Sequence, residues 1–329
     1  MKAVIAVSGA GGFIGSHLVE HLLALGHDVR AMIHYRSDGS WGWLNTYKEN
    51  PNPHLEVVAG DIRDPFWVEQ NLTSIDIVFH LAALIAIPFS YQAPASYVAT
   101  NVQGSINVLQ AARKHNCQRV ILMSTSEVYG TAQTIPITER HPVVGQSPYS
   151  ASKIGMEAQG EAFYRSFDLP LSIVRPFNNY GPRQSLRGVL PSILLQLLRR
   201  TPELKLGDLR PSRDFLYVKD CVKALYAISQ SVNTIGKTLN IATGKEISIE
   251  QLAHTLIALL NPETKIVQDP QRLRPNQSEV FRLCGDPTFL KECTGWQAEY
   301  SLEAGLQETI DWFREADKQK AYPSQSYQV

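Results

Sequence analysis

The residues of this sequence whose types and spacing most clearly suit catalytic chemistry are Tyr149 and Lys153, which are four positions apart. On a helix this spacing places the two side chains one turn apart on the same face. A free tyrosine has a pKa of about 10 and is a poor base at neutral pH, but a neighbouring ammonium group favours its phenolate. A lone Tyr-x-x-x-Lys pattern is mostly structural, so a catalytic interpretation needs support from elsewhere in the chain.

That support comes from side chains that follow an earlier apolar run. A strand expected over Val120–Met123 is followed by Ser124 and Thr125, so the Thr125 hydroxyl would lie at a strand end. Two residues later Glu127 adds a carboxylate, which hydride transfer alone does not need. It suits a reaction in which a proton is taken from carbon and passed to a leaving oxygen. The alternative is that Glu127 is an ion-paired structural residue at the end of the strand.

A glycine-rich turn follows the first expected strand and leads into a helix. Glycines at positions 9, 12 and 15 allow a tight turn and the close approach of a pyrophosphate, while the N–H groups of the helix start stay free to bind it. A tight turn without a ligand is the alternative, but the strand before and the helix after it favour dinucleotide binding. The GxxGxxG spacing resembles the turn of the extended short-chain dehydrogenases/reductases. The cofactor-binding residues expected from the turn and from this resemblance are Gly9, Gly12, Phe13, Ile14, Gly15, Arg36, Asp61, Ile62, Leu81, Ala82, Ala83, Asn101, Tyr149, Lys153 and Pro176.

Two positions near this site have competing interpretations. NAD sites usually carry Asp or Glu near the end of the second strand, to bind the adenosine ribose, whereas this chain has Arg36 there. Arg36 suits the 2′-phosphate of NADP, or it is a solvated surface charge; we expect NAD, and NADP stays open. His80 lies within the stretch that resembles the family's cofactor contacts, but we interpret its side chain as a hydrogen-bonded core histidine.

Several longer stretches carry a narrower resemblance. They are 40–44, 81–88, 125–132, 146–153, 175–183, 213–215, 272–275 and 294–296. Through them the chain from Met1 to about Phe313 is similar to the nucleotide-sugar 4,6-dehydratases of the extended short-chain family. It is most similar to the UDP-N-acetylglucosamine 4,6-dehydratases of the legionaminic-acid pathway type.

The resemblance implies a lyase reaction without net redox change. Tyr149, aided by Lys153 and Thr125, would take the proton of the sugar 4-hydroxyl as hydride moves to a tightly bound NAD. Glu127 would then take the proton from carbon 5 and return it to the 6-hydroxyl, which leaves as water. Hydride would finally return to carbon 6, so the cofactor is regenerated in each cycle.

The triplet around Glu127 departs from many 4,6-dehydratases, which carry an acidic Asp where this chain has Ser126. The GDP-mannose branch also has Ser there, and Glu127 would then act both as base and as acid. UDP-glucuronate decarboxylases carry the same Thr-Ser-Glu triplet, so a decarboxylase or a 4-epimerase of the same fold is the alternative function. A non-catalytic NAD(P)-sensing protein is a remote alternative, because such proteins typically lose the tyrosine that this chain keeps as Tyr149.

The substrate is expected to be held by basic and amide side chains of the second half. Arginine binds phosphate through a planar fork of N–H donors, which suits a nucleotide diphosphate. The alternative for each arginine is a surface or interdomain ion pair. The expected substrate-binding residues are Thr125, Asn178, Asn179, Arg187, Arg213 and Arg274, with Arg187 the weaker candidate among the arginines.

The elements that must position these residues alternate between strand and helix in the first half. Strands are expected at Val4–Val7, Val29–Ile33, Leu55–Val58, Ile77–Leu81, Val120–Met123 and Ser172–Val174. This pattern predicts an α/β fold, with a Rossmann-like doubly wound parallel sheet and a smaller α+β substrate-binding domain. We expect the dinucleotide-binding domain to span 1–178 plus about 214–242. The substrate domain would span 179–213 plus about 243–315, and 316–329 would form a flexible tail.

Composition excludes several other classes of protein. Lys plus Arg and Asp plus Glu both total 31, so no basic patch points to nucleic acid. The apolar runs are too short to span a membrane, and the Cys and His spacings predict neither a metal site nor disulfides. We therefore expect a cytoplasmic enzyme. By family resemblance it should be a homodimer, in which helices near Ser96–His115 and Tyr149–Phe167 pack as a four-helix bundle through apolar positions such as Val102, Ile106 and Leu109.

Overall fold

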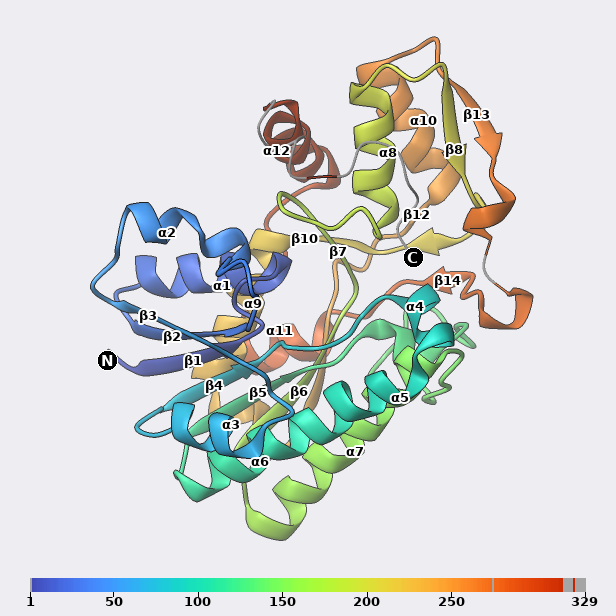
Figure 1. Ribbon diagram of the computed structural model, residues 1–329. Helices are drawn as coiled ribbons and strands as arrows, with labels where there is room; N and C mark the ends of the chain where they lie inside the picture. The colour runs from blue at the N-terminus through green and yellow to red at the C-terminus, as the bar shows by residue number, and fades with distance from the viewer. Residues whose placement is uncertain (1, 274, 316–321, 323–329) are drawn as a thin grey trace.

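A seven-stranded sheet forms the centre of the larger lobe in the computed structural model, which describes residues 2–273, 275–315 and 322 (Figure 1). Its strand order is β11-β6-β5-β4-β1-β2-β3, and all neighbours are parallel. The strands are β1 (Val4–Ser8), β2 (Asp28–His34), β3 (Leu55–Gly60), β4 (Ile77–His80), β5 (Arg119–Met123), β6 (Leu171–Pro176) and β11 (Thr238–Ile241). The order reverses between β1 and β4, which confirms the expected Rossmann-like doubly wound sheet.

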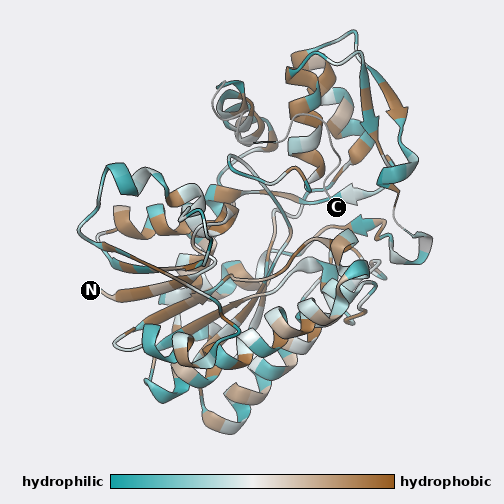
Figure 2. Cartoon of the chain, in the orientation of Figure 1, coloured by the Kyte–Doolittle hydropathy of each residue, from teal (hydrophilic) through white to brown (hydrophobic). Residues whose placement is uncertain are grey.

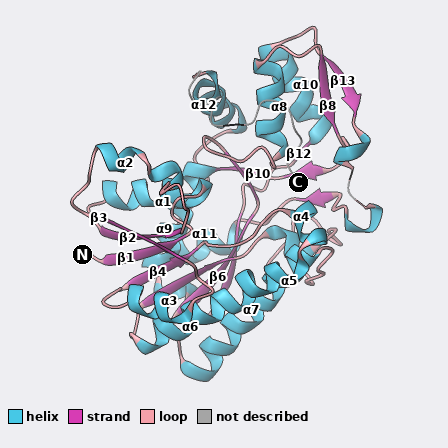
Figure 3. Ribbon diagram, in the orientation of Figure 1, coloured by secondary structure: helices cyan, strands magenta, loops and turns pink. Residues whose placement is uncertain are grey.

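Helices cover both faces of this sheet (Figure 3). One face carries α1 (Phe13–Ala24), α9 (Val218–Gln230) and α11 (Thr288–Thr294), and the other carries α3 (Pro65–Asn71), α6 (Gly104–Lys114) and α7 (Pro148–Phe167). The strands are apolar on both faces because alternate residues enter different cores: Ile5 and Val7 pack with α1 and α9, whereas Ala6 packs with α6 and α7. Figure 2 shows these strands as a largely hydrophobic layer between helices with mixed surfaces.

The smaller lobe is built around three helices, α8 (Val189–Leu198), α10 (Ile249–Leu260) and α12 (Leu302–Arg314). They share an apolar core of their own, to which each helix contributes fully buried side chains such as Leu194, Leu252 and Phe313. Short strands pair around it. They are β7 (Asn178–Tyr180) with β10 (Phe215–Tyr217), β8 (Glu203–Leu206) with β13 (Lys265–Gln268), and β9 (Ser212–Arg213) with β12 (Ile247–Ser248) and β14 (Arg282–Leu283).

Short helices connect these parts. They are α2 (Thr46–Glu49), α4 (Ile87–Gln92) and α5 (Pro94–Tyr97), the 3-10 turns η1 (Gly42–Leu44), η3 (Ser126–Tyr129), η4 (Val232–Thr234), η5 (Pro270–Arg272) and η6 (Asn276–Ser278), and the π-helical turn η2 (Val98–Gln103). The helix expected near Ser96–His115 therefore consists of α5, η2 and α6 in succession. Leu109, one of the positions expected to face a partner, is fully buried in the chain's own core.

One segment that was expected in the substrate domain packs against the main sheet. Leu290 of α11 and Trp296 pack in the apolar core that contains Ile5 and Leu18, against the main sheet. We therefore propose that 288–296 belongs to the larger lobe rather than to the substrate domain.

Most of the expected tail, 316–321 and 323–329, lies outside the described residues. Tyr322 is buried: its ring packs against Phe313, and its hydroxyl donates a hydrogen bond of 2.9 Å to the Gln184 carbonyl. In the described part of the chain, no helix combines the length and the apolar character that a membrane span requires.

Candidate active site

The glycine-rich turn joins β1 directly to α1, and its backbone is tightly packed. A Cβ atom on Gly15 would lie 2.2 Å from the Gly9 carbonyl oxygen, so only glycine lets the helix start so close to the turn. Gly12 is the N-cap of α1 and offers no side-chain cap, so the first N–H groups of the helix remain available to a phosphate. The local geometry therefore fits the expected pyrophosphate site.

A second segment, Ser40–Leu44, holds this turn from outside. The Trp43 N–H donates a 3.0 Å hydrogen bond to the Gly11 carbonyl, and a Cβ on Gly42 would lie 2.3 Å from the same oxygen. Sequence reasoning used this segment only as part of a resemblance and did not assign it to the site. The sequence signal for it is the Trp-Gly-Trp run at 41–43. In the structure, the glycine of this run has a positive φ of 65°.

A cleft of about 660 Å³ runs from this turn to the strand ends of β5 and β6. The expected site residues that line it are Gly9, Gly12, Phe13, Ile14, Gly15, Arg36, Leu81, Ala82, Ala83, Thr125, Ser126, Glu127, Tyr149, Lys153, Pro176, Asn178, Asn179 and Arg187. Ser40, Trp41, Gln184 and Ser185 also line it and were missed. A further hollow of about 800 Å³, beside α10 in the smaller lobe, contains none of the expected catalytic residues.

Several expected cofactor contacts lie outside this lining. The Asp61 carboxylate is bound by Arg63, with 2.5 Å between Nη2 and Oδ2, and Ile62 packs against Gly104. The Asn101 side chain is buried; its Oδ1 accepts the Leu84 N–H at 2.8 Å and its amide donates to the Leu84 carbonyl. Asn101 thus holds the backbone of Leu84, whose neighbours Ala83 and Ile85 line the cleft.

At the far end of the cleft, Arg36 lines the wall near the end of β2. This is the position at which the sequence does not distinguish NAD from NADP. Its guanidinium is paired with the Asp38 carboxylate, 2.9 Å between Nη2 and Oδ2, and both side chains are exposed. A carboxylate is therefore present close to this strand end, two residues beyond Arg36.

Tyr149 and Lys153 lie on the first turns of α7, as their spacing predicts. Ser147 caps this helix through a capping box with Ser150, which fixes where it begins. Burial raises the pKa of Tyr149, and a hydrogen bond with Thr125 opposes that rise. Lys153 donates 2.7 Å to the carbonyl oxygen of Met123, and burial lowers its pKa to about 8.

Glu127 follows in η3, the turn directly after β5. Thr125 caps this turn, accepting the Glu127 N–H at 3.2 Å, while Ser126 is buried. Across the described residues the Glu127 carboxylate has neither a hydrogen-bond donor nor an ion-pair partner, and its charge raises the pKa of Tyr149. The alternative that Glu127 is an ion-paired structural residue is therefore wrong for this structure.

His80 is a core residue, as expected. Its Nδ1 is 2.7 Å from the Ser8 hydroxyl and its Nε2 is 2.9 Å from the Ser105 hydroxyl. Ser8 accepts the Ala82 N–H, so its hydrogen is free to reach Nδ1, and Nε2 then donates. Burial lowers the pKa of His80 to about 3, which keeps the imidazole neutral.

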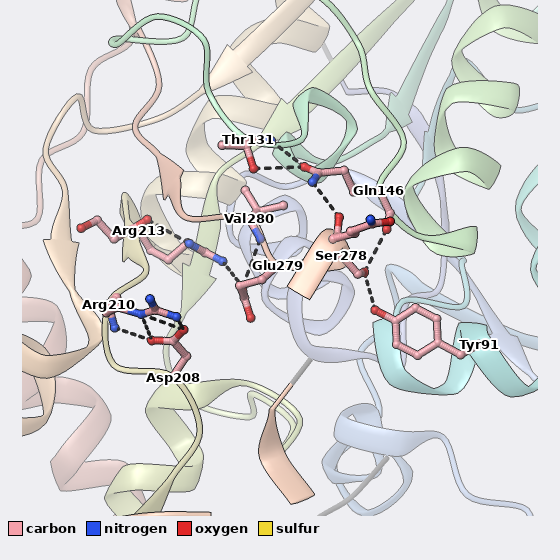
Figure 4. Close-up of polar contacts among 11 residues, drawn as sticks. Tyr91, Thr131, Gln146, Asp208, Arg210, Arg213, Ser278, Glu279 and Val280 are labelled. Carbon is pink, nitrogen blue, oxygen red and sulfur yellow. Dashed lines mark hydrogen bonds and ion pairs between the residues drawn. The ribbon is translucent and has the colours of Figure 1, made fainter. Parts of the chain in front are cut away.

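The three candidate arginines for the substrate have different surroundings. Arg187 is exposed at the cleft, whereas Arg213 is buried, lies outside the cleft lining, and pairs with Glu279 at 3.4 Å (Figure 4). Arg274 lies outside the described residues.

Figure 4 also shows the Ser278 hydroxyl hydrogen-bonded to the hydroxyl of Tyr91 in α4. The chain around Ser278 and Glu279 thus connects the smaller lobe to the larger one.

Buried acceptor atoms in the cleft wall have no partner within the described chain. They are Asn178 Oδ1, Asn179 Oδ1 and Gln184 Oε1. Buried polar atoms are normally hydrogen-bonded, so these oxygens fit a ligand that brings N–H or O–H donors.

Comparison with known proteins assigns the family. A model of the GDP-mannose 4,6 dehydratase family matches residues 6–309. The chain belongs to this family. The expectation of an extended short-chain dehydrogenase/reductase that modifies nucleotide sugars is thereby confirmed at the level of the family, which includes epimerases, dehydratases and decarboxylases.

Individual relatives represent all three reactions. A UDP-N-acetyl-alpha-D-glucosaminuronate decarboxylase of Bacillus cytotoxicus is 34% identical over 96% of this chain and 99% of its own length. The structure of a dTDP-glucose 4,6-dehydratase of Streptomyces venezuelae with NAD bound has 28% identity and a TM-score of 0.85, covering 95% of this chain and 97% of that one. A UDP-glucose 4-epimerase of Thermotoga maritima with UDP-glucose has 31% identity and a TM-score of 0.85, covering 95% and 99%. The choice among the three reactions must therefore come from the residues of the site.

Proposed function

We propose that the protein is a nucleotide-sugar 4,6-dehydratase that acts on UDP-N-acetylglucosamine. The observation that carries this proposal is the carboxylate of Glu127, which has no partner among the described residues and lines the same cleft as Tyr149 and Lys153. Oxidation or epimerisation at carbon 4 needs only the hydroxyl, tyrosine and lysine. A carboxylate with no structural partner is what removal of the carbon 5 proton requires.

The cofactor in this proposal is NAD. The phosphate-binding turn fits its pyrophosphate, and the Streptomyces venezuelae relative binds NAD in its structure. Asp38 neutralises Arg36, which makes the cleft less suited to a 2′-phosphate. When bound, the nicotinamide would supply the acceptor and the donor of hydride.

The residues of this chain would carry the proton transfers. Tyr149 would take the proton of the 4-hydroxyl, with the Lys153 ammonium stabilising its phenolate and Thr125 holding its oxygen. Oxidation at carbon 4 makes the hydrogen on carbon 5 acidic. Glu127 would take that proton and deliver it to the 6-hydroxyl, which leaves as water. Ser126 is buried and carries no acid, so Glu127 serves both steps.

The nucleotide would be held from the smaller lobe. We propose Arg187 as the first contact of the diphosphate, because its guanidinium lines the cleft without a partner among the described residues. Asn178 and Asn179 would contact the sugar through their unpaired oxygens. Arg213 and Arg274 remain proposed contacts, with Arg213 needing to leave Glu279.

We also propose that the protein forms a homodimer through α5, η2, α6 and α7. Val98 of η2 supports this, since 56% of its surface is exposed although it is apolar. Val102 and Ile106 are half-buried, so part of their apolar surface is accessible to a second copy of the chain. Leu109 is fully buried and offers no such surface.

A UDP-glucuronate-type decarboxylase is the second candidate. It is favoured by the Bacillus cytotoxicus relative and by the free guanidinium of Arg187, which would suit a sugar carboxylate. Incubation with UDP-, GDP- and dTDP-sugars, including uronates, separates the reactions by product mass. Loss of one water supports the proposal, loss of carbon dioxide supports the decarboxylase, and an isomer of unchanged mass supports an epimerase.

A further inference from the structure

Helix α7 carries a third buried functional group in line with the catalytic pair. Tyr149, Lys153 and Glu157 are four residues apart and are all buried, so they form one row on the face of α7 that packs against the sheet. The next residue at this spacing, Glu161, is exposed and pairs with Arg165. The row of buried groups therefore ends at Glu157.

Glu157 is held by an unusually complete set of donors. Arg175 of β6 binds it with two parallel hydrogen bonds, 2.9 Å from Nε to Oε1 and 2.6 Å from Nη2 to Oε2. Ser124, next to Thr125, donates to the same Oε1. Arg175 also donates to the Tyr129 hydroxyl at 3.0 Å, so each member of the ion pair has a further hydrogen-bond partner.

We propose that Glu157 is a positioning residue that keeps the Lys153 side chain charged, and so sets the pH range in which Tyr149 and Lys153 work together. Lys153 donates to a neutral carbonyl, that of Met123, and no carboxylate is bonded to it in the described structure. Its burial disfavours the charged ammonium. The negative charge of Glu157, one turn further along α7, compensates.

The charges around Lys153 support this assignment. Burial lowers the pKa of Lys153, and Glu157 raises it. Arg175 carries a charge of the same sign as Lys153, and His80 is neutral. In the described structure, Tyr97 of α5 and Glu127 of η3 face Tyr149, and Tyr129 of η3 lies against Arg175.

The test is a direct titration of Lys153, with Glu157→Gln as the variant. Lysine labelled with ¹³C at Cε reports the charge of its own amine by NMR, and Lys153→Met identifies the resonance. The Gln side chain keeps the shape and one acceptor for Arg175. We expect the pKa of Lys153 to fall by about one unit or more, the size typical of a nearby opposite charge. A pKa within about 0.3 units of the native value, smaller than any such effect, would overturn the proposal.

Three further variants make the result specific. Glu161→Gln, on the same helix but exposed, should leave the Lys153 titration unchanged. Glu157→Gln combined with Arg175→Gln removes both charges, so no unpaired cation is left buried if the single variant folds poorly. The Lys153 pKa of this double variant should lie below that of Arg175→Gln alone, because only the charge of Glu157 then differs, and equal values would refute the assignment.

The inference rests on the catalytic pair of the proposed function, but the titration needs no substrate. In an assay with the accepted nucleotide sugar, the alkaline limb of kcat/KM should move to lower pH by the same amount as the Lys153 pKa. If the substrate panel shows no dehydration, the proposed function fails while the titration still decides the role of Glu157. If the alkaline limb of kcat/KM stays in place while the pKa of Lys153 falls, Glu157 does not set the pH range in which the enzyme works.

Discussion

Replacement of Glu127 by Gln is the perturbation that separates elimination from plain hydride transfer. The variant keeps the shape of the side chain and removes its basicity. Because the Glu127 carboxylate has no partner in the described structure, the change should alter the free energy of unfolding by no more than about 0.5 kcal/mol. A loss of activity would then report chemistry rather than misfolding.

The two half-reactions should respond in opposite ways. The charge of Glu127 raises the pKa of Tyr149, so its removal makes the tyrosine easier to deprotonate and should not slow oxidation at carbon 4. Elimination should slow by about a hundred- to ten-thousandfold, the usual contribution of a general acid–base group. This corresponds to about 3–5 kcal/mol in the barrier.

The assay is single-turnover absorbance of the reduced nicotinamide, followed by mass analysis of the bound sugar. In Glu127→Gln, reduced cofactor and a 4-keto sugar that still carries its 6-hydroxyl should accumulate together. Tyr149→Phe is the control, because it should block the first step and give no such absorbance. Near-native turnover in Glu127→Gln would refute the role of Glu127 in elimination. The protein would then be interpreted as an epimerase or a dehydrogenase of the same fold.

Three other expectations follow from the structure. Gly15→Ala should abolish NAD binding measured by calorimetry, since its Cβ would meet the turn at 2.2 Å; native affinity would show that the turn is not the phosphate site. Asp38→Asn should improve NADP binding relative to NAD by up to about fivefold, the value of an exposed ion pair, and an unchanged ratio would remove Arg36 from cofactor selection. Light scattering at micromolar concentration should give a dimer, and Val98→Glu should give a monomer with native secondary structure; a native monomer contradicts the proposed interface.

Local patterns in the sequence were sufficient for the elements and for the first candidates. Strands appear as short apolar runs, and the turn after β1 appears as spaced glycines, because periodicity and backbone freedom act within a few residues. Tyr149 and Lys153 were identified for the same reason, since helical geometry alone places residues four apart on one face. These features depend on neighbours along the chain.

The tertiary structure decided which distant groups meet. Nothing local indicates that Arg175 of β6 pairs with Glu157 of α7, or that the Glu127 carboxylate has no partner among the described residues. The Asp38 partner of Arg36 and the docking of Tyr322 also appear only in space. The physical reason is that strand order and helix packing bring these side chains together across long sequence separations. The same residue types therefore become a buried ion pair, a free base or a surface charge according to what folds against them.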